Sequence, residues 1–400
     1  MPQKQRAGRL CRNVAAVGFL LLTACSDRPG HGSVAAGSSL DPCRIGSSVS
    51  RWSTAPDQEY VRVAKVGDTD DLWFEQIGGI HASAHAVYVL DTGSARVMMF
   101  DHDLRTRGTF GRSGDGPGEL GESVPSRAAA DGGSRRWIDG VGDELVVFDG
   151  RRLSLFTTNG DFVRTLIRST AEIGLTAFTN RIRSSDGTVL FAAGGYDPFG
   201  GQQRSTADGP IMSIRQWNEG KVHDVFQLRL PPLPAARDGV PFRGPRQALP
   251  LWDALGDCVA LSDGSQPFVV VTSPTRPSVA DTVWFELPPV ADASGHDEEV
   301  SGLLAAVGGG SDMPEPTAVR RIWDMIFDPD GQLWILPAPA RADAGSGIEV
   351  LRIALESGLT RVDTVPRFPE AFGPPGVYFA TARDSLGQVL LEKYELSRGR

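Results

Sequence analysis

VYVLDTGSARVMMFDHDLRTRGTFGRSGDGPGEL, residues 87–120, is the stretch that decides the fold. Residues 87–90 are apolar on both faces, which is typical of a short strand that is covered on both sides. The turn composition of residues 91–95 predicts a reversal into a second strand over residues 96–100. A third strand is expected over residues 106–110, and the glycines and proline that follow it predict a shaped connection.

The same unit recurs at residues 145–167, LVVFDGRRLSLFTTNGDFVRTLI. When the two copies are aligned, Asp91 corresponds to Asp149 and Arg96 corresponds to Arg152. Each aspartate precedes a turn and each arginine follows it. We therefore expect a structural ion pair across both turns.

These two copies, together with the exit GDGPGEL at residues 114–120, resemble the NHL-like repeats of bacterial six-bladed β-propeller lipoproteins. The resemblance covers about residues 57–396 and is sharpest in the first two copies. It implies an all-β fold of six blades, each a small antiparallel sheet. Because that family is defined mostly by its fold, the resemblance implies little chemistry.

The rest of the chain can be divided into further copies of the unit. We expect six blades at about residues 76–110, 127–167, 177–228, 249–287, 322–365 and 377–394, although a weak seventh could lie in the insertions. The last range has only two obvious strands. Residues 59–66 read as an isolated strand near the N-terminus, and such a strand can close the ring so that no strand edge stays open.

The N-terminus reads as a lipoprotein signal. Residues 1–24 carry a basic start and a short apolar run, and Leu22-Thr23-Ala24-Cys25 resembles a bacterial lipobox, so we expect lipidation of Cys25. Residues 25–56 are then expected to be a flexible tether to a propeller at residues 57–396. Ser26 is not the aspartate that retains some lipoproteins in the inner membrane. This favours an extracytoplasmic protein anchored at the outer membrane or the cell surface.

The charge of the chain limits its partners. The net charge is −9, and removal of residues 1–24 takes away four basic residues and no acidic ones, which leaves −13. Such an acidic protein is a poor partner for nucleic acid or anionic lipid. We therefore expect attachment to the membrane through the N-terminal lipid, and binding of an envelope protein or a small ligand.

The long insertions are expected to gather at one end of the propeller. They lie between the second and third strands of a blade, or between the fourth strand and the next blade, and both kinds of link emerge on the same face. The insertions are residues 111–121, 194–210, 229–248, 288–318 and 337–347. We expect this loop-rich face to bind a ligand or protein through the side chains most often used in recognition, namely Tyr196, Phe199, Phe242, Arg243 and Arg246.

No catalytic motif stands out, and the chain contains no G-x-S-x-G, P-loop or CxxC sequence. His81 and His85 lack a third ligand, which argues against zinc. Gluconolactonase-like propellers hold a metal in the central tunnel with Asn, Asp and Glu, and here only Asn180 lies near an inner strand. A metal-dependent hydrolase or lyase with a site in the tunnel is therefore the alternative to a binding or scaffolding function.

No cofactor is expected, although Ca²⁺ could bind Asp115 and Glu119 in the glycine-rich exit. We favour a structural role for these two carboxylates, in which they tie the turn to neighbouring backbone amides. After cleavage and acylation, Cys43 and Cys258 are the cysteines that remain. In an oxidising compartment they could form a disulfide, provided that their Cα atoms come within about 7 Å.

Overall fold

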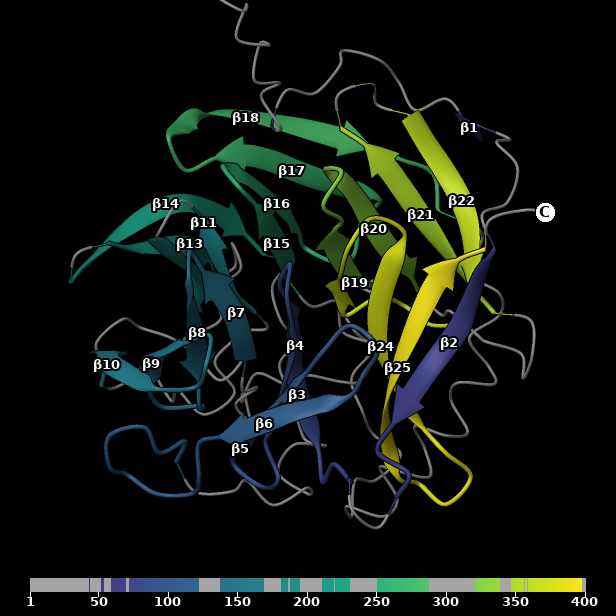
Figure 1. Ribbon diagram of the computed structural model, residues 1–400. Coiled ribbons are helices and arrows are strands. Elements are labelled where there is room, and N and C mark those ends of the chain that lie inside the picture. Colours follow the sequence, from purple (N-terminus) through teal and green to yellow (C-terminus); the bar gives the residue numbers. More distant parts are fainter. Residues whose placement is uncertain are drawn as a thin grey trace, which may run out of the picture. The chain divides into compact units, whose positions relative to one another are not determined.

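A computed structural model describes residues 43, 52–53, 59–69, 72–121, 137–168, 181–185, 188–194, 211–218, 220–230, 250–287, 321–338, 347–355, 357 and 359–397. The strands in these residues form six sheets, five of four strands and one of five. Neighbouring strands within each sheet are antiparallel, except where a short N-terminal strand joins one edge. The first strands of successive sheets lie beside one another around a common axis (Figure 1). The domain is a six-bladed β-propeller.

The blades follow one another along the chain. From the innermost to the outermost strand, they are β3 (Ile77–Ala82), β4 (Val87–Asp91), β5 (Arg96–Phe100) and β6 (Thr106–Phe110); β7 (Trp137–Val141), β8 (Glu144–Phe148), β9 (Leu153–Thr157) and β10 (Phe162–Ile167); β11 (Ile182–Ser185), β12 (Thr188–Gly194), β13 (Ile211–Asn218) and β14 (Lys221–Arg229); β15 (Leu251–Leu255), β16 (Cys258–Ser262), β17 (Phe268–Ser273) and β18 (Arg276–Trp284); β19 (Ile322–Phe327), β20 (Gln332–Pro337), β21 (Ile348–Ala354) and β22 (Leu359–Val365); and β23 (Ala371–Phe372), β24 (Val377–Arg383), β25 (Val389–Leu396) and β2 (Tyr60–Val66).

The N-terminal strand closes the ring, as predicted from residues 59–66. β2 pairs with β25 in antiparallel register, and in Figure 1 the purple β2 lies along the yellow β25. The innermost strand of this blade, β23, has only two residues. It was not predicted because a strand of that length has no readable alternation of apolar and polar residues.

A short strand also lies against the fifth blade. β1 (Trp52–Ser53) pairs in parallel with β22. Cys43 packs against the apolar cluster of blades four and five. Both points lie in the stretch that we expected to be a tether.

Apolar clusters fill the seams between blades. One joins Tyr88 and Leu90 of the first blade to Ile138 and Val147 of the second, and corresponding clusters occupy the other seams around the ring. β4 is buried along its whole length, which agrees with its apolar character on both faces. The core of a propeller is therefore a set of seams, and the axis itself is left for other side chains.

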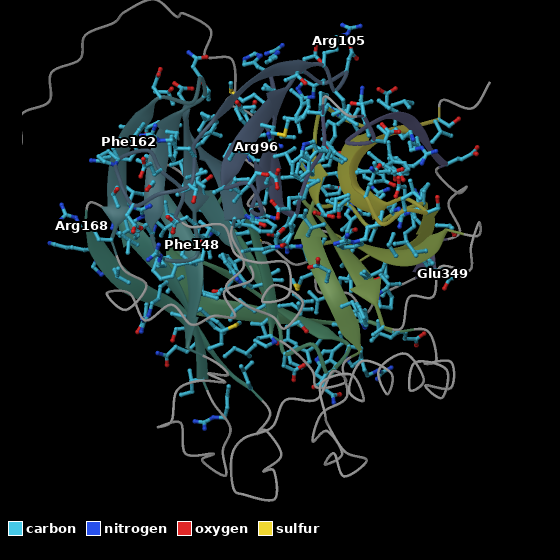
Figure 2. All side chains as sticks on the ribbon, turned by 90° about the horizontal axis from the view of Figure 1, so that it is seen from below. Arg96, Arg105, Phe148, Phe162, Arg168 and Glu349 are labelled. Carbon is cyan, nitrogen blue, oxygen red and sulfur yellow. The ribbon has the colours of Figure 1, made fainter. Side chains whose placement is uncertain are left out.

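The strand order divides the connections between the two ends of the propeller. Turns from the first to the second strand and from the third to the fourth lie at one end. Links from the second to the third strand, and from one blade to the next, lie at the other. In Figure 2, Arg105, in the turn between β5 and β6, lies at the upper edge of the domain, and Glu349, near the start of β21, lies well below it.

Several sequence predictions lie outside the described residues. These are the signal segment, Cys25, Asn180 and the candidate binding residues Tyr196, Phe199, Phe242, Arg243 and Arg246. No helix within the described ranges is long and apolar enough to cross a membrane.

Candidate functional site in the axial cavity

A cavity of about 260 Å³ lies on the propeller axis. Residues from the first strands of all six blades, or from positions next to those strands, line it. Because the lining includes Gly256 and Pro329, which belong to turns between first and second strands, the cavity lies toward that end of the axis. The ionisable residues of the lining are His81, Asp139, Arg183, Asp253 and Glu370.

A repeated tripeptide places these side chains. In each of the first four inner strands an ionisable residue follows a buried apolar residue and precedes a small one. Since successive side chains of a strand point to opposite faces, the apolar residue packs in a seam and the ionisable one can face the axis. The tripeptides are Ile80-His81-Ala82, Ile138-Asp139-Gly140, Ile182-Arg183-Ser184 and Trp252-Asp253-Ala254.

His81 and Asp139 form a hydrogen-bonded pair across the first two blades. Nδ1 of His81 lies 2.9 Å from Oδ1 of Asp139, and Oδ2 of Asp139 accepts a hydrogen bond from the Ser184 amide at 3.0 Å. Burial alone would raise the pKa of Asp139. The hydrogen bond from His81 and the charge of Arg183 outweigh burial and hold that pKa below its ordinary value of 3.8. An ionised Asp139 favours the imidazole tautomer with its proton on Nδ1, which leaves a lone pair on Nε2.

Gly140 gives the imidazole its space. A Cβ at this position would lie 2.5 Å from Nε2 of His81 and 2.6 Å from its Cε1, closer than non-bonded atoms approach. The ring also stacks on Tyr88, with centroids 6.1 Å apart. His81 is therefore positioned by three neighbouring groups: a carboxylate, an aromatic ring and the bare backbone of a glycine.

Two arginines from the third blade neutralise carboxylates of the fourth and fifth. Nε of Arg183 donates to Asp253, whose other oxygen accepts from the Phe327 amide at 2.6 Å. Nη1 of Arg181 lies 3.6 Å from Oδ1 of Asp253, and Nη2 of Arg181 donates to Oδ1 of Asp324 at 2.7 Å.

The indole of Trp137 covers both guanidinium groups. The centroid of the ring lies 5.8 Å from Cζ of Arg181 and 5.5 Å from Cζ of Arg183. Contacts of this kind add an electrostatic attraction between the cation and the ring face. The arginines are thus held in place before any ligand arrives.

Glu370 is the carboxyl group of the cavity that no cation contacts among the described residues. Its Oε1 accepts hydrogen bonds from the amide and hydroxyl of Thr381. Burial raises the pKa of Glu370 above its ordinary value of 4.5, and Asp324 adds to the increase, although Thr381 and Arg181 oppose it. This carboxyl group is therefore easier to protonate than an exposed one.

Three polar groups of the lining keep hydrogen-bonding capacity. Within the described part of the chain, no protein partner occupies Nε2 of His81, the terminal nitrogens of Arg183 or Oε2 of Glu370. The described residues contain no group of three His, Cys, Asp or Glu side chains that could hold a metal ion. The cavity can thus accept and donate hydrogen bonds, and it lacks the donor set of a metal centre.

The predicted ion pairs across the turns are confirmed. Nη2 of Arg96 lies 3.3 Å from Oδ2 of Asp91, and Nε of Arg152 lies 3.0 Å from Oδ2 of Asp149. Arg152 also donates to the backbone oxygens of Gly114, Asp115 and Glu119 in the glycine-rich exit. It therefore holds the connection between the first two blades.

The carboxylates of that exit have structural partners. Glu119 accepts a hydrogen bond from the Gly116 amide at 2.6 Å and one from Arg112 at 2.9 Å, as expected for a residue that ties the turn to the backbone. Asp115 instead binds Nη2 of Arg151 at 2.9 Å, so its partner is a side chain and not a backbone amide.

The two histidines singled out in the sequence have different surroundings. His81 lines the cavity, whereas His85 is exposed in the turn after β3. Sequence reasoning missed Asp139, Arg183, Asp253 and Glu370. The repeated tripeptide is the signal that could have revealed the first three, but it becomes meaningful only when the first strands of the blades are aligned.

Cys43 lies close to the backbone of Cys258. Its thiol donates to the backbone oxygen of Asp257 at 3.1 Å and to that of Thr272 at 3.3 Å. Cys258 is buried in the same apolar cluster. The structure records both side chains as thiols, and their pairing under oxidising conditions stays a prediction.

Comparisons with known proteins agree on the fold. No protein-family model and no curated protein sequence matches the chain. Among solved structures, a protein described as exported, from Bacteroides fragilis, aligns with a TM-score of 0.50 at 10% identity, over 88% of this chain and 99% of that one. At such identity the likeness shows the propeller fold alone.

Two further structures match more loosely. A member of the DUF4221 family from Bacteroides vulgatus aligns with a TM-score of 0.48 at 10% identity, over 86% of this chain and 99% of that one. A virginiamycin B lyase from Staphylococcus aureus aligns with a TM-score of 0.42 at 11% identity, over 85% of this chain and 100% of that one.

Proposed function

We propose that this propeller is a binding protein that holds a small polar molecule in its axial cavity. The observation that carries the proposal is the ring of ionisable side chains around that cavity, with hydrogen-bonding capacity left on His81, Arg183 and Glu370. A concave site with a few convergent polar groups is the usual form of a small-molecule site. Its volume of about 260 Å³ suits a ligand smaller than a typical drug.

Stability alone is a poor explanation for this ring. Buried ion pairs are often no more stabilising than well-packed apolar side chains of similar size, because desolvation offsets their attraction. The seams between the blades show that this chain can pack apolar clusters. Charged residues on the axis are better explained by a ligand that uses them.

The address is part of the proposal. We propose that the mature protein is anchored outside the cytoplasm by lipid on Cys25, with the propeller facing the surrounding compartment. The loop-rich face, with Tyr196, Phe199, Phe242, Arg243 and Arg246, is proposed as a second surface for an envelope protein. Since the described residues hold no metal-ligand cluster, binding in the cavity is proposed without a metal.

Blocking the cavity tests the proposal. A thermal-shift screen of the lipid-free protein, residues 26–400, against small polar molecules should find compounds that raise its Tm. Ala82→Trp places an indole in the lining and should abolish these shifts, whereas Leu386→Trp, at a position that is 82% exposed in the turn between β24 and β25, should keep them. Equal shifts in all three proteins, or no shift with any compound, would contradict binding in the cavity.

A further inference from the structure

We infer that the ligand of the axial cavity is an uncharged molecule with several hydroxyl groups, about the size of a single sugar ring. This inference rests on the proposed function and names the chemical class of its ligand. It follows from the charges, the open hydrogen-bonding positions and the apolar walls of the cavity.

The charges of the site leave no place for a charged ligand. Two guanidinium groups, on Arg181 and Arg183, stand against the three carboxylates of Asp139, Asp253 and Asp324. An anionic ligand would add a further negative charge beside these carboxylates. A cationic ligand would meet the terminal nitrogens of Arg183, which carry positive charge and can only donate hydrogen bonds.

The open positions require a group that both donates and accepts. Nε2 of His81, in the tautomer that Asp139 favours, accepts a hydrogen bond, whereas the terminal nitrogens of Arg183 donate. Glu370 can do either, according to its protonation. A hydroxyl group is both donor and acceptor, so neighbouring hydroxyls can satisfy all three residues, whereas a carboxylate suits only Arg183 and an ammonium group suits only the acceptors.

The remaining walls are apolar. Leu255, Phe327, Pro329 and Phe372 line the cavity together with the polar groups. Side chains of this kind can pack against the C–H faces of a ring whose edge carries the hydroxyls. The volume of about 260 Å³ corresponds to about nine water molecules, so one sugar ring fits and a long oligosaccharide does not.

A matched series of sugars tests the inference by isothermal titration calorimetry. The uncharged probes are glucose, galactose, mannose and myo-inositol, and the charged probes are glucuronate and glucosamine. At least one uncharged probe should bind, and both charged probes should bind at least about tenfold more weakly, because each leaves a group of the site badly matched. A charged probe that binds as tightly as the best uncharged one would overturn the inference.

Two histidine variants assign the binding to this site. His81→Ala should weaken the best probe by about tenfold, the effect of one lost hydrogen bond. His85→Ala, four residues away and exposed, should bind as the wild type does. Unchanged binding by His81→Ala would place the ligand elsewhere and overturn the inference.

The outcome also separates this inference from the proposed function. If no uncharged probe binds while other compounds still raise the Tm of the wild type but not that of Ala82→Trp, the cavity is a binding site for another chemical class and the inference fails alone. If no compound of any class acts through the cavity, the proposed function fails as well.

Discussion

Single residues of the axial cavity have ionisation states that their neighbours set. Asp139 is held in its charged form by His81 and Arg183, whereas burial and the nearby Asp324 favour the protonated form of Glu370. Two carboxyl groups in one small cavity thus have pKa values shifted in opposite directions. The consequence for stability can be measured as a function of pH.

Glu370→Gln is expected to stabilise the protein near neutral pH. Since the pKa of Glu370 is higher in the folded chain than its ordinary value of 4.5, ionisation opposes folding, and wild-type stability falls as the pH rises through the folded pKa. Glutamine keeps the oxygen that accepts from Thr381 and cannot ionise. The Tm difference between variant and wild type should be small below the ordinary pKa and positive at neutral pH. A difference that does not change with pH would contradict the shift.

The connection between the first two blades shows how a single side chain can hold one element to another. Arg152 is mostly buried, pairs with Asp149 and reaches three backbone oxygens of the glycine-rich exit. Its neighbour Arg151 is more than half exposed and binds the exposed Asp115. The two adjacent arginines therefore form a matched pair for mutation.

Arg152→Ala should lower the free energy of unfolding by about 2–4 kcal/mol, because it leaves a buried carboxylate and several backbone oxygens without their donor. Arg151→Ala should change it by less than about 0.5 kcal/mol, as is usual for an exposed pair. Urea unfolding followed by tryptophan fluorescence measures both. Equal effects of the two substitutions would show that the exit is not held by Arg152.

At the scale of the whole molecule, the N-terminal segment connects the propeller to its surroundings. Cys43 lies against the backbone of blade four, and β1 extends the sheet of blade five. A covalent bond at Cys43 would fix this segment to the body of the propeller, whereas a lipid on Cys25 would fix it to a membrane.

A disulfide between Cys43 and Cys258 is expected when the protein is purified from an oxidising compartment without reductant. The contacts of the Cys43 thiol with the backbone of Asp257 and Thr272 place it beside Cys258. The protein should then show no reactive thiol after unfolding, and reductant should lower its Tm because the cross-link restricts the unfolded chain. Two titratable thiols in unfolded, unreduced protein would exclude the bond.

Cys25→Ala is expected to release the protein from membranes. The wild type should incorporate an azido-fatty acid and partition with the envelope, and the variant should do neither, because acyl chains are the proposed attachment. Cys43→Ala serves as the control and should still be labelled. Membrane partitioning that persists in Cys25→Ala would contradict lipid anchoring at this residue.

The strands and the closure of the ring could be predicted because they depend on local patterns. Alternation of apolar and polar residues, turn composition and the pairing of Asp91 with Arg96 all act within a few residues of the chain. The isolated strand at β2 was also readable, since a ring with an open edge requires a partner for it. β23 was not, because its two residues are recognised only by their pairing with β24.

The amino-acid sequence by itself determined the blades, their number and the strand that closes them, since each depends on neighbouring residues. Only the tertiary structure decided the candidate site. His81, Asp139, Arg183, Asp253 and Glu370 lie on five different blades, and the closed ring brings them to one cavity. Their hydrogen bonds, charges and pKa shifts depend on distances across the axis, which no local pattern in the chain encodes.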